Sequence, residues 1–400
     1  MTSAITSERW LVAVTEYAGL TRYTGGIGRH YAALLPALVA QGKEVDLVVF
    51  SDEPLIPHAD MQGVRVIRHH TFRRLPRLLH AAMRALLVRR AASRVAYDRI
   101  FLAEWGALGA ALPRRAPLIT NLATSTRLTN EISGYARSTL PLARRAEEAV
   151  RIRLEDRQVR RSAAVIPISN AMLRRVEAQY PMLTPSRIVR NCIDVDAVID
   201  GAATAELPSG WPTGDAPIVL FLGRLERRKG VVDAVAAFAT VADRHPDARL
   251  VLAGSSGDSR FEPSRADLLA LLPESAHNRV TWLGHIDGPA LYRGIGAATV
   301  AICPSRWEGF GNVALEVKAA GTPLVCTSGS GFNDFCTTEV DSLMVAPGDP
   351  SALAGAICRL IEDRELAGSL VAAASEGVHD FAPGPVARDL ADAANKLLRR

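Results

Sequence analysis

Apolar positions in the first half of the chain form short runs that alternate with longer stretches of helical spacing. The runs Trp10–Val14, Glu44–Phe50 and Arg99–Ala103 have the length and apolar content of buried strands. Between them, Arg29–Gln41 and Leu75–Ala96 carry apolar residues in a helical pattern. Alternating strands and helices are typical of a parallel sheet covered by helices on both faces. Further elements of this series are expected at Val64–Ile67, Pro117–Asn121, Leu140–Arg161 and Ala164–Ile168.

A second series of the same kind follows residues 201–215, which are rich in Gly, Pro, Ser and Thr and which we interpret as a linker. Its expected strands are Ile218–Gly223, Arg249–Ala253, Val280–Leu283, Val300–Cys303 and Pro323–Thr327, and its expected helices are Val231–Arg244, Arg265–Leu272, Asn312–Ala320, Pro350–Leu366, Glu365–Glu376 and Pro385–Arg400. A chain of 400 residues also exceeds the size at which one hydrophobic core stops growing.

The sequence therefore predicts an α/β fold with two Rossmann-like domains, residues 1–205 and 206–380, and a terminal helix in 381–400 that packs back on the first domain. Parallel sheets bind ligands at the carboxyl ends of their strands. We expect the two sets of loops at these ends to face one another across a cleft.

Composition narrows the class of protein. Apolar residues make up 48% of the chain and charged residues 22%, which is ordinary for a globular protein. No apolar run approaches the roughly 20 residues of a membrane span, and no signal peptide is evident. The five cysteines are widely spaced without a C-x-x-C pair, which argues against a disulfide framework or a zinc site. We expect buried thiols and a cytoplasmic protein.

Charge is distributed unevenly between the halves. Residues 1–200 hold 29 Lys and Arg against 18 Asp and Glu, while residues 201–400 hold 18 against 24. The arginine-rich segment 68–94 combines this charge with leucines at helical spacing. Two interpretations remain open: a helix with an apolar face on the core and a solvated basic face, or peripheral contact with an anionic membrane. The segment contains Arg68, Arg73, Arg74, Arg77, Arg84, Arg89, Arg90 and Arg94 together with Leu75, Leu78, Leu79, Met83, Leu86 and Leu87.

The most informative segment is Pro304–Gly321, which contains two carboxylates eight residues apart. Glu308 lies in a glycine-rich loop after an expected strand, and Glu316 lies about one turn into the following helix. The start of a helix attracts anions through its unpaired N–H groups. An ionised carboxylate accepts hydrogen bonds from paired hydroxyls. Carboxylates on both sides of an anion site therefore favour a ligand with a sugar on one side and a ribose on the other.

Two cations flank the loop in Phe221–Gly230. Arg224 and Lys229 follow a strand directly and bracket the turn into the next helix. Fixed cations of this kind stabilise the charge of a departing diphosphate. A solvated charge cluster is the alternative, because Glu226, Arg227 and Arg228 are also charged.

A third segment, Thr24–His30, places Gly25, Gly26 and Gly28 between the first strand and its helix. Glycines allow close approach of the backbone to a phosphate or a sugar, although they also serve ordinary turns. The spacing is not the dinucleotide-binding pattern G-x-G-x-x-G. For His30, which opens the helix, we expect a packing role.

Together these segments resemble the retaining glycosyltransferases of family 4, which have the two-Rossmann GT-B architecture. The run from Glu308 to Glu316 is similar to the E-x7-E motif of the family, and Gly223–Gly230 looks like its phosphate-binding loop. Shorter similarities occur in the expected order along most of the chain, at Gly25–Arg29, Pro167–Asn170, Arg190–Asp194, Leu252–Gly254 and Trp282–Ile286.

The resemblance implies a metal-independent transfer of a sugar from a nucleotide-diphosphate donor to a hydroxyl acceptor, which is a glycan, a lipid-linked compound or a small molecule. No cofactor beyond the donor substrate is expected. Glu308, Arg224 and Lys229 are the candidate catalytic residues, with Glu308 on the transferred sugar and the two cations on the diphosphate. Glu316 is expected to hold the donor ribose. The remaining candidate binding residues are Gly25, Gly26, Gly309, Phe310, Gly311, Asn312, Gly284, His285 and Ile286.

One departure concerns a histidine that the family commonly carries after a strand of the first domain. Here Leu118–Thr126 places Ala123 at the matching position. That histidine contacts the donor sugar, so its loss suggests the hypothesis of a donor without a 6-hydroxyl, such as a deoxy sugar or a pentose. Equal transfer from an ordinary hexose donor would contradict the hypothesis. Asn121, Thr124 and Ser125 offer replacement hydrogen bonds or helix capping.

Other functions share the architecture, because a fold does not fix an activity. A nucleotide-sugar epimerase and a phosphorylase are enzyme alternatives, although no signal for lysine-bound pyridoxal phosphate stands out. A catalytically inert binding or regulatory protein is an alternative from a different class, which the loss of the histidine favours. Nucleic-acid binding would use the basic half but lacks an aromatic stacking pattern.

Overall fold

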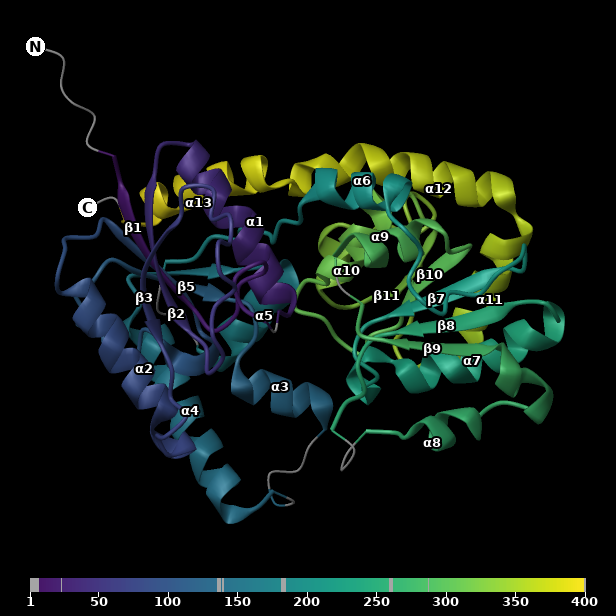
Figure 1. The fold of residues 1–400 in the computed structure, drawn as a ribbon, viewed down its shortest axis with the longest axis horizontal. Helices are drawn as coiled ribbons and strands as arrows, with labels where there is room; N and C mark the ends of the chain where they lie inside the picture. Colours follow the sequence, from purple (N-terminus) through teal and green to yellow (C-terminus); the bar gives the residue numbers. More distant parts are fainter. Residues whose placement is uncertain are drawn as a thin grey trace, which may run out of the picture. The chain divides into compact units, whose positions relative to one another are not determined.

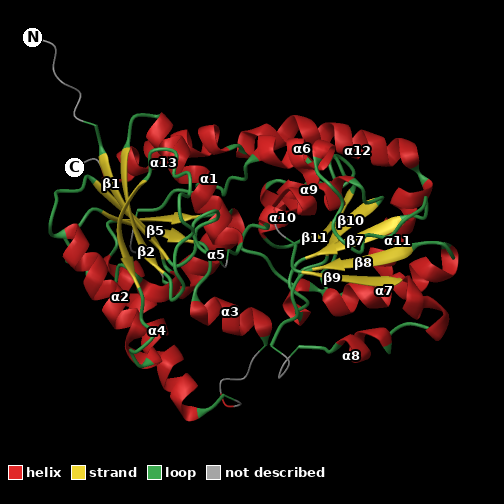
Figure 2. Ribbon diagram, viewed as in Figure 1, coloured by secondary structure: helices red, strands yellow, loops and turns green. Residues whose placement is uncertain are grey.

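The computed structural model describes residues 7–22, 24–134, 138, 140–180, 185–258, 262–286 and 288–398. They divide into two compact units. Unit 1 comprises the described residues of Met1–Ile193 and Phe381–Arg400, and unit 2 comprises those of Asp194–Asp380. Each unit contains one six-stranded sheet with helices around it (Figure 2). The prediction of an α/β fold with two Rossmann-like domains is confirmed.

Unit 1 is built on the strand order β3-β2-β1-β4-β5-β6, and every neighbouring pair is parallel. Its strands are β1 (Arg9–Val14), β2 (Glu44–Phe50), β3 (Arg65–His70), β4 (Arg99–Ala103), β5 (Leu118–Leu122) and β6 (Ala164–Pro167). Its α-helices are α1 (Gly26–Ala40), α2 (Arg77–Ala92), α3 (Thr126–Ser133), α4 (Leu142–Arg161), α5 (Asn170–Gln179) and α13 (Pro383–Leu398) (Figure 1).

Alternate residues of the central strand β1 enter two different cores. Trp10 and Val12 pack into a cluster with α1 and α13, and Leu11 and Ala13 pack into a cluster with α2. A strand buried on both faces needs a continuous apolar run, which the sequence of β1 supplies. Helix α13 thus completes unit 1 although it is the last element of the chain, and Arg399 and Arg400 lie outside the described residues.

Unit 2 has the order β12-β11-β10-β7-β8-β9, which is the same Rossmann topology. Its strands are β7 (Ile218–Leu222), β8 (Arg249–Ala253), β9 (Val280–Gly284), β10 (Val300–Cys303), β11 (Leu324–Thr327) and β12 (Leu343–Val345). Its α-helices are α6 (Val195–Thr204), α7 (Val231–Arg244), α8 (Arg265–Leu269), α9 (Gly288–Gly296), α10 (Asn312–Ala319), α11 (Pro350–Glu362) and α12 (Arg364–Gly377).

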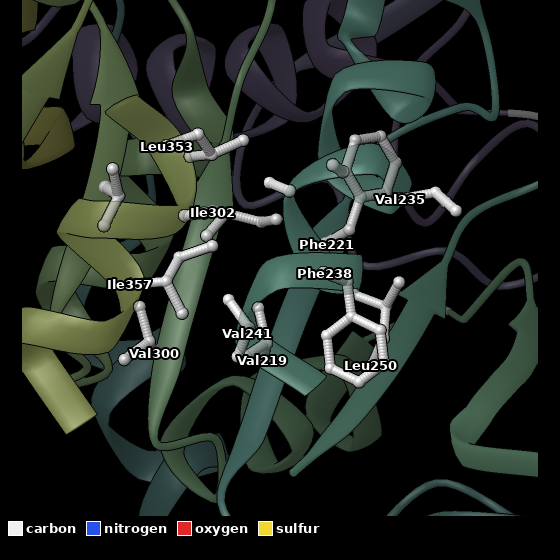
Figure 3. Packing of buried hydrophobic residues seen from close by; sticks show 14 of the residues in the cluster. Val219, Phe221, Val235, Phe238, Val241, Leu250, Val300, Ile302, Leu353 and Ile357 are labelled. Carbon is white, nitrogen blue, oxygen red and sulfur yellow. The ribbon is translucent and has the colours of Figure 1, made fainter. Parts of the chain in front are cut away.

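One face of this sheet is covered by α7 and α11. Phe238 from α7 and Ile357 from α11 lie in a fully buried cluster with Phe221 of β7, Leu250 of β8 and Ile302 of β10 (Figure 3). Burial of each such side chain contributes roughly 1.5–3 kcal/mol. This core fixes the middle strands, and with them the positions of the loops at their carboxyl ends.

The structure corrects the expected boundary. Residues 201–204, read as the start of a linker, belong to α6, and α6 packs on α9 within unit 2. Gly201 shows the closeness of this packing, since a Cβ there would lie 2.9 Å from the ring of Tyr292. Unit 2 therefore begins at Asp194 rather than at 206.

Several elements were not expected from the sequence, namely α3, α5, α6, α9 and β12. All are short, and the hydrophobic pattern of a short element is ambiguous. Among the described residues, none of the helices combines the length and the apolar character needed to traverse a bilayer. All five cysteines are buried and free, as expected.

Candidate functional site

The candidate site of unit 2 lies where the strand order reverses. Strand β7 lies between β8 and β10, so successive connections leave these strands in opposite directions. In open parallel sheets, ligands bind at this switch point, outside the carboxyl ends of the strands. Arg224 and Lys229 follow β7, and Glu308 follows β10. Topology thus places three predicted catalytic residues on the two loops that border the switch point.

Lys229 and Glu308 form an ion pair between their Nζ and Oε1 atoms. The Ser305 hydroxyl donates a further hydrogen bond to the same carboxylate oxygen over 2.7 Å. Burial opposes ionisation of Glu308, but Lys229, Arg228 and Ser305 outweigh it and hold the pKa of its carboxyl below the ordinary value. Glu308 is therefore a carboxylate at neutral pH, beside a fixed ammonium group.

The two loops approach so closely that a glycine is required between them. Gly230 has φ +76°, and a Cβ there would lie 1.9 Å from the Pro304 carbonyl oxygen. Next to this contact, the Arg306 amide donates to the Arg228 carbonyl over 2.8 Å. The Thr327 hydroxyl also holds the carbonyl of Ser305, over 2.6 Å. The Lys229–Glu308 pair thus rests on two loops locked by backbone contacts.

The turn into α10 is held by aromatic packing. Gly311 has φ +103°, and a Cβ there would lie 2.2 Å from the Phe332 ring. The Phe310 side chain is buried and its ring centroid lies 5.0 Å from that of Phe335. Phe310 can therefore meet a ligand only through its backbone, and the binding roles expected for Gly309, Phe310, Gly311 and Asn312 stay predictions. Glu316 is buried on α10.

Arg224 has a different partner from Lys229. Its guanidinium lies 2.7 Å from Oε1 of Glu226, while Arg228 lies 2.7 Å from Oε2 of the same carboxylate. Glu226 is buried, so the alternative of a wholly solvated charge cluster does not describe this loop. The Arg224 side chain remains 49% exposed, so it can reorient toward a ligand at small cost. Sequence reasoning treated Glu226 as surface charge and missed its bridging position.

Of the predicted base-binding residues, Gly284 ends β9, and His285 and Ile286 follow it. This strand forms the edge of the sheet and is separated from β7 by β8. They lie on the same carboxyl edge as the ion pair but not beside it. A long ligand that spans this edge would be needed to touch both places.

The glycine turn of unit 1 already binds a carboxylate of the protein itself, that of Glu16. The amides of Gly25 and Gly28 donate to the two carboxylate oxygens of Glu16, over 3.1 and 2.9 Å. The start of a helix stabilises negative charge, and Glu16 supplies it. The sequence signal was present, an acidic residue between the first strand and the glycines, but it was not used. Gly26 lies at the start of α1 within the same turn.

A second carboxyl that sequence reasoning missed follows β4. Glu104 is buried and accepts a hydrogen bond from the Ala123 amide over 2.8 Å, at the position where the family commonly has its histidine. Burial raises the pKa of Glu104 to about 8, which the backbone hydrogen bonds only partly offset. It lines a pocket of about 240 Å³ between α3, α4 and α5, together with Leu122, Met172 and Tyr180. No local motif distinguishes Glu104 in the sequence.

The proposed substitutes for the histidine have other partners. Ser125 caps α3 and accepts a hydrogen bond from the Leu128 amide over 3.1 Å, so its capping role is confirmed. Asn121 is buried, and its amide donates to the Ile166 carbonyl over 3.4 Å. His30 is also buried, and its Nδ1 accepts a hydrogen bond from the Cys192 amide over 3.1 Å. Burial lowers the pKa of His30 to about 4, so the imidazole is neutral and serves packing.

Comparison with known proteins identifies the family. Residues 24–197 match the model of glycosyltransferase family 4, and residues 216–363 match the model of glycosyl transferases group 1. The glycogen synthase of Mycobacterium tuberculosis is 29% identical over 370 residues, which cover 85% of this chain and 83% of that protein. The two family models and this relative thus describe most of both units.

Solved structures show the same fold. The sucrose-phosphate synthase of Thermosynechococcus elongatus superposes with a TM-score of 0.77 at 23% identity, over 98% of this chain and 99% of that one. HepE of Anabaena, in complex with UDP and glucose, superposes with a TM-score of 0.70 at 17% identity, over 97% and 100%. The chain therefore belongs to the family 4 glycosyltransferases and has their GT-B fold.

Proposed function

We propose that this glycosyltransferase moves a sugar from a nucleotide-diphosphate donor to a hydroxyl acceptor, with retention of anomeric configuration and without a metal ion. The observation that carries the proposal is the Lys229–Glu308 pair at the switch point of unit 2. An ammonium group and an ionised carboxylate side by side suit a ligand in which a diphosphate adjoins a hydroxylated ring.

The roles follow from the chemistry of each group. Lys229, and Arg224 after it leaves Glu226, would neutralise the diphosphate as its charge develops. Glu308 would accept hydrogen bonds from hydroxyls of the transferred sugar, and Glu316 from those of the ribose. Backbone amides at the start of α10 would meet the distal phosphate. Gly284, His285 and Ile286 would lie near the base, and Gly25 and Gly26 near the phosphate and sugar.

Retention is proposed from the family and from the position of these groups. Lys229, joined by Arg224 once that side chain has reoriented, would perform at the leaving group the task that a metal performs in other transferases. The departing phosphate would take the proton of the acceptor hydroxyl as the new glycosidic bond forms on the face that the phosphate leaves. Oxygen from the acceptor replaces oxygen from the phosphate at the anomeric carbon, so the atoms balance.

The acceptor is proposed to bind to unit 1. Its carboxyl edge carries the glycine turn and the pocket lined by Glu104. Burial favours the neutral form of Glu104 at pH 7, and a neutral carboxyl donates as well as accepts a hydrogen bond. Hydroxyl groups satisfy both functions.

Nucleotide binding tests the donor site. We would compare thermal unfolding with UDP, GDP, dTDP, ADP and CMP for the wild type and Glu316→Gln, and use Glu376→Gln, an exposed position on α12, as the matched control. UDP is the first choice, because HepE of Anabaena binds it in the same fold. A ligand at 100 times its Kd stabilises the folded state by about 2.7 kcal/mol.

We expect one diphosphate to stabilise the wild type and the control but not Glu316→Gln. Turnover with sugars of that nucleotide would follow, including a hexose, a 6-deoxy sugar and a pentose to test the consequence of Ala123. No stabilisation by any nucleotide would favour the inert binding protein instead, an alternative consistent with Glu16 already filling the glycine turn.

Retention has its own test. Slow hydrolysis of the donor by water releases a free sugar whose first-formed anomer NMR identifies before mutarotation. An α-linked donor should give the α anomer first. The β anomer would exclude retention and leave the donor site intact.

A further inference from the structure

An open groove of about 620 Å³ lies on unit 1, between α2 and α4, outside the candidate site. The two helices pack against each other on one face of the sheet (Figure 1). The loop before β5 closes one side of the groove. The groove is lined by Leu86, Arg89, Ala111, Leu112, Pro113, Arg114, Arg115, Arg157 and Arg161.

Topology places this groove at the amino ends of the strands of unit 1, whereas Glu104 and the glycine turn lie at their carboxyl ends. Arg89 lies in the last turn of α2, and Arg161 is the last residue of α4. Arg114 and Arg115 precede β5, at its amino end. Glu104 instead follows the carboxyl end of β4. The groove and the candidate site are therefore separate features of unit 1.

Five arginines line the groove, and no carboxylate does. In the described part of the chain, none of the five makes an ion pair of 4 Å or less. Arg157 donates to the Ala110 carbonyl over 3.0 Å and Arg161 to the Leu112 carbonyl over 3.4 Å, so these two are oriented by neutral groups. Desolvation, with repulsion from Arg157 and Arg114, lowers the pKa of Arg161. The groove therefore presents concentrated positive charge.

Exposed leucines lie along α2, the helix that also carries Arg89. Leu78, Leu79 and Leu86 of α2 are 42%, 46% and 52% exposed, although leucine is usually buried. Leu79 and Leu86 are two helical turns apart and share a face, and Leu86 lines the groove itself. Met83 and Leu87 of the same helix pack on the core instead. The apolar residues of α2 thus divide between the core and the surface, which neither sequence interpretation foresaw.

We propose that this groove and the adjoining leucines dock unit 1 on an anionic phospholipid bilayer. Guanidinium groups bind lipid phosphates in pairs of hydrogen bonds, and each basic residue near the surface adds to the attraction. Leucine side chains beside them enter the boundary between headgroups and acyl chains. A nucleic acid would satisfy the arginines but not the leucines, and the groove lining contains no aromatic side chain on which bases stack.

Vesicle sedimentation tests the proposal with the full chain. Phosphatidylcholine vesicles, with and without phosphatidylglycerol, would be compared for the wild type, R114Q/R115Q and R174Q/R187Q. The control pair removes the same charge from exposed positions of unit 1 outside the groove. We expect binding to the anionic vesicles only, a loss of roughly fivefold in affinity for each groove arginine removed, and a much smaller loss for the control pair.

A second variant separates the two components. L79S/L86S should weaken binding to anionic vesicles while its remaining binding keeps the steep salt dependence of charge attraction. Because the substituted side chains are exposed and none of them lines the candidate site, all three variants should unfold at the wild-type temperature and keep the nucleotide-dependent stabilisation. These readouts distinguish failure of this proposal from failure of the proposed function.

Several results would overturn the proposal. They are no binding of the wild type to anionic vesicles, an equal loss from both arginine pairs, and an unchanged affinity in L79S/L86S. Binding of free tripolyphosphate that depends on Arg114 and Arg115, without vesicle binding, would instead reveal a soluble anion site. Retention of short duplex DNA in place of vesicles would assign the groove to nucleic acid.

Discussion

The two units have the same strand order but different chemistry at the point where that order reverses. In unit 2, the switch point between β7 and β10 carries a lysine paired with an ionised glutamate. In unit 1, the switch point between β1 and β4 is followed by Glu16, which neutralises the glycine turn, and by buried Glu104. Topology determines which end of a sheet can bind a ligand, while a few side chains determine the charge at that end.

Two glutamates make the contrast measurable. Glu104 and Glu308 both follow a strand next to the switch point, and burial opposes ionisation of both. Lys229 and Ser305 outweigh burial at Glu308 and lower its pKa, whereas the backbone hydrogen bonds to Glu104 do not outweigh burial there. The same residue type is therefore charged in one unit and neutral in the other at pH 7. The following changes test this comparison, from the largest expected effect to the smallest.

Removal of Lys229 should have the largest effect. Lys229→Ala leaves the Glu308 carboxylate without its cation and removes the group expected to stabilise the leaving diphosphate. We expect donor hydrolysis to fall by about 10²–10³-fold in kcat. Arg224→Ala is the matched control, with a smaller fall, because its side chain already has Glu226 as a partner and is half-exposed. An equal fall in kcat for both variants would contradict a special role of Lys229.

Substitution of Gly230 should disrupt the loop contact that holds the pair. Gly230→Ala creates a clash with the Pro304 carbonyl at a residue with positive φ, so we expect a loss of about 3 kcal/mol or more in the free energy of unfolding. Gly355→Ala in α11 is the control, since nothing lies within 4 Å of its added Cβ and alanine favours a helix. Denaturant unfolding measures both, and similar midpoints would contradict the close approach.

The pH dependence of stability should distinguish Glu104 from an ordinary glutamate. Between the unfolded pKa of about 4.3 and the folded pKa of about 8, the native state holds a proton that the unfolded state lacks. The contribution of Glu104 to stability is therefore fully present below pH 4 and is lost as the pH rises toward 8. Glu104→Gln should remove a slope of up to about 1.4 kcal/mol per pH unit in this window.

Melting temperatures across this range check the prediction, with Glu177→Gln, an exposed position on α5, as the control. The control should keep the wild-type slope. If Glu104→Gln keeps it as well, the carboxyl is ionised in the folded protein and the contrast with Glu308 fails.

Glu16 should give the smallest effect. Glu16→Ala removes the acceptor of two amides at the glycine turn and should cost about 1–2 kcal/mol of stability. Added sulfate should restore part of the loss, because an external anion can then occupy the turn. The midpoint of unfolding at matched ionic strength, with chloride as the control salt, measures the restoration. Equal restoration by both salts would show that the turn does not bind anions.

The sequence predicted most of the long elements well, and the reason is physical. Glu44–Phe50, Arg99–Ala103 and Val231–Arg244 were expected with the bounds that the structure gives them. Each has a strong apolar pattern, and each has a Gly, Asp or His residue that suits a turn within two positions of one of its ends. α6 was not expected, and its last four residues were assigned to the linker, because its Gly and Ala residues carry little pattern and are buried by packing on α9.

The residues of the candidate site also fall into two groups, those that the sequence points to and those that only the structure reveals. Arg224, Lys229, Glu308 and Glu316 could be chosen as candidates because they lie in compact segments around strand ends and glycines, where local order implies proximity; their roles stay predictions. Glu226 lies in the same segment as Arg224, and Glu16 precedes the glycine turn, but both look like surface charge until their partners are known. Glu104 could not be chosen among the acidic residues of the chain, because its burial depends on α3, α4 and α5.

By itself, the sequence determined the fold class and the family, and it indicated the residues that we propose for a nucleotide-sugar donor, because periodicity and motif order are local properties. Only the tertiary structure decided which carboxyls are charged, which leucines of α2 reach the surface and where unit 2 begins. These properties depend on solvent exclusion and on partners distant in the chain, as Lys229 and Glu308 show across 79 residues. A pKa or an exposed face is a property of the packed environment, and no single segment contains that environment.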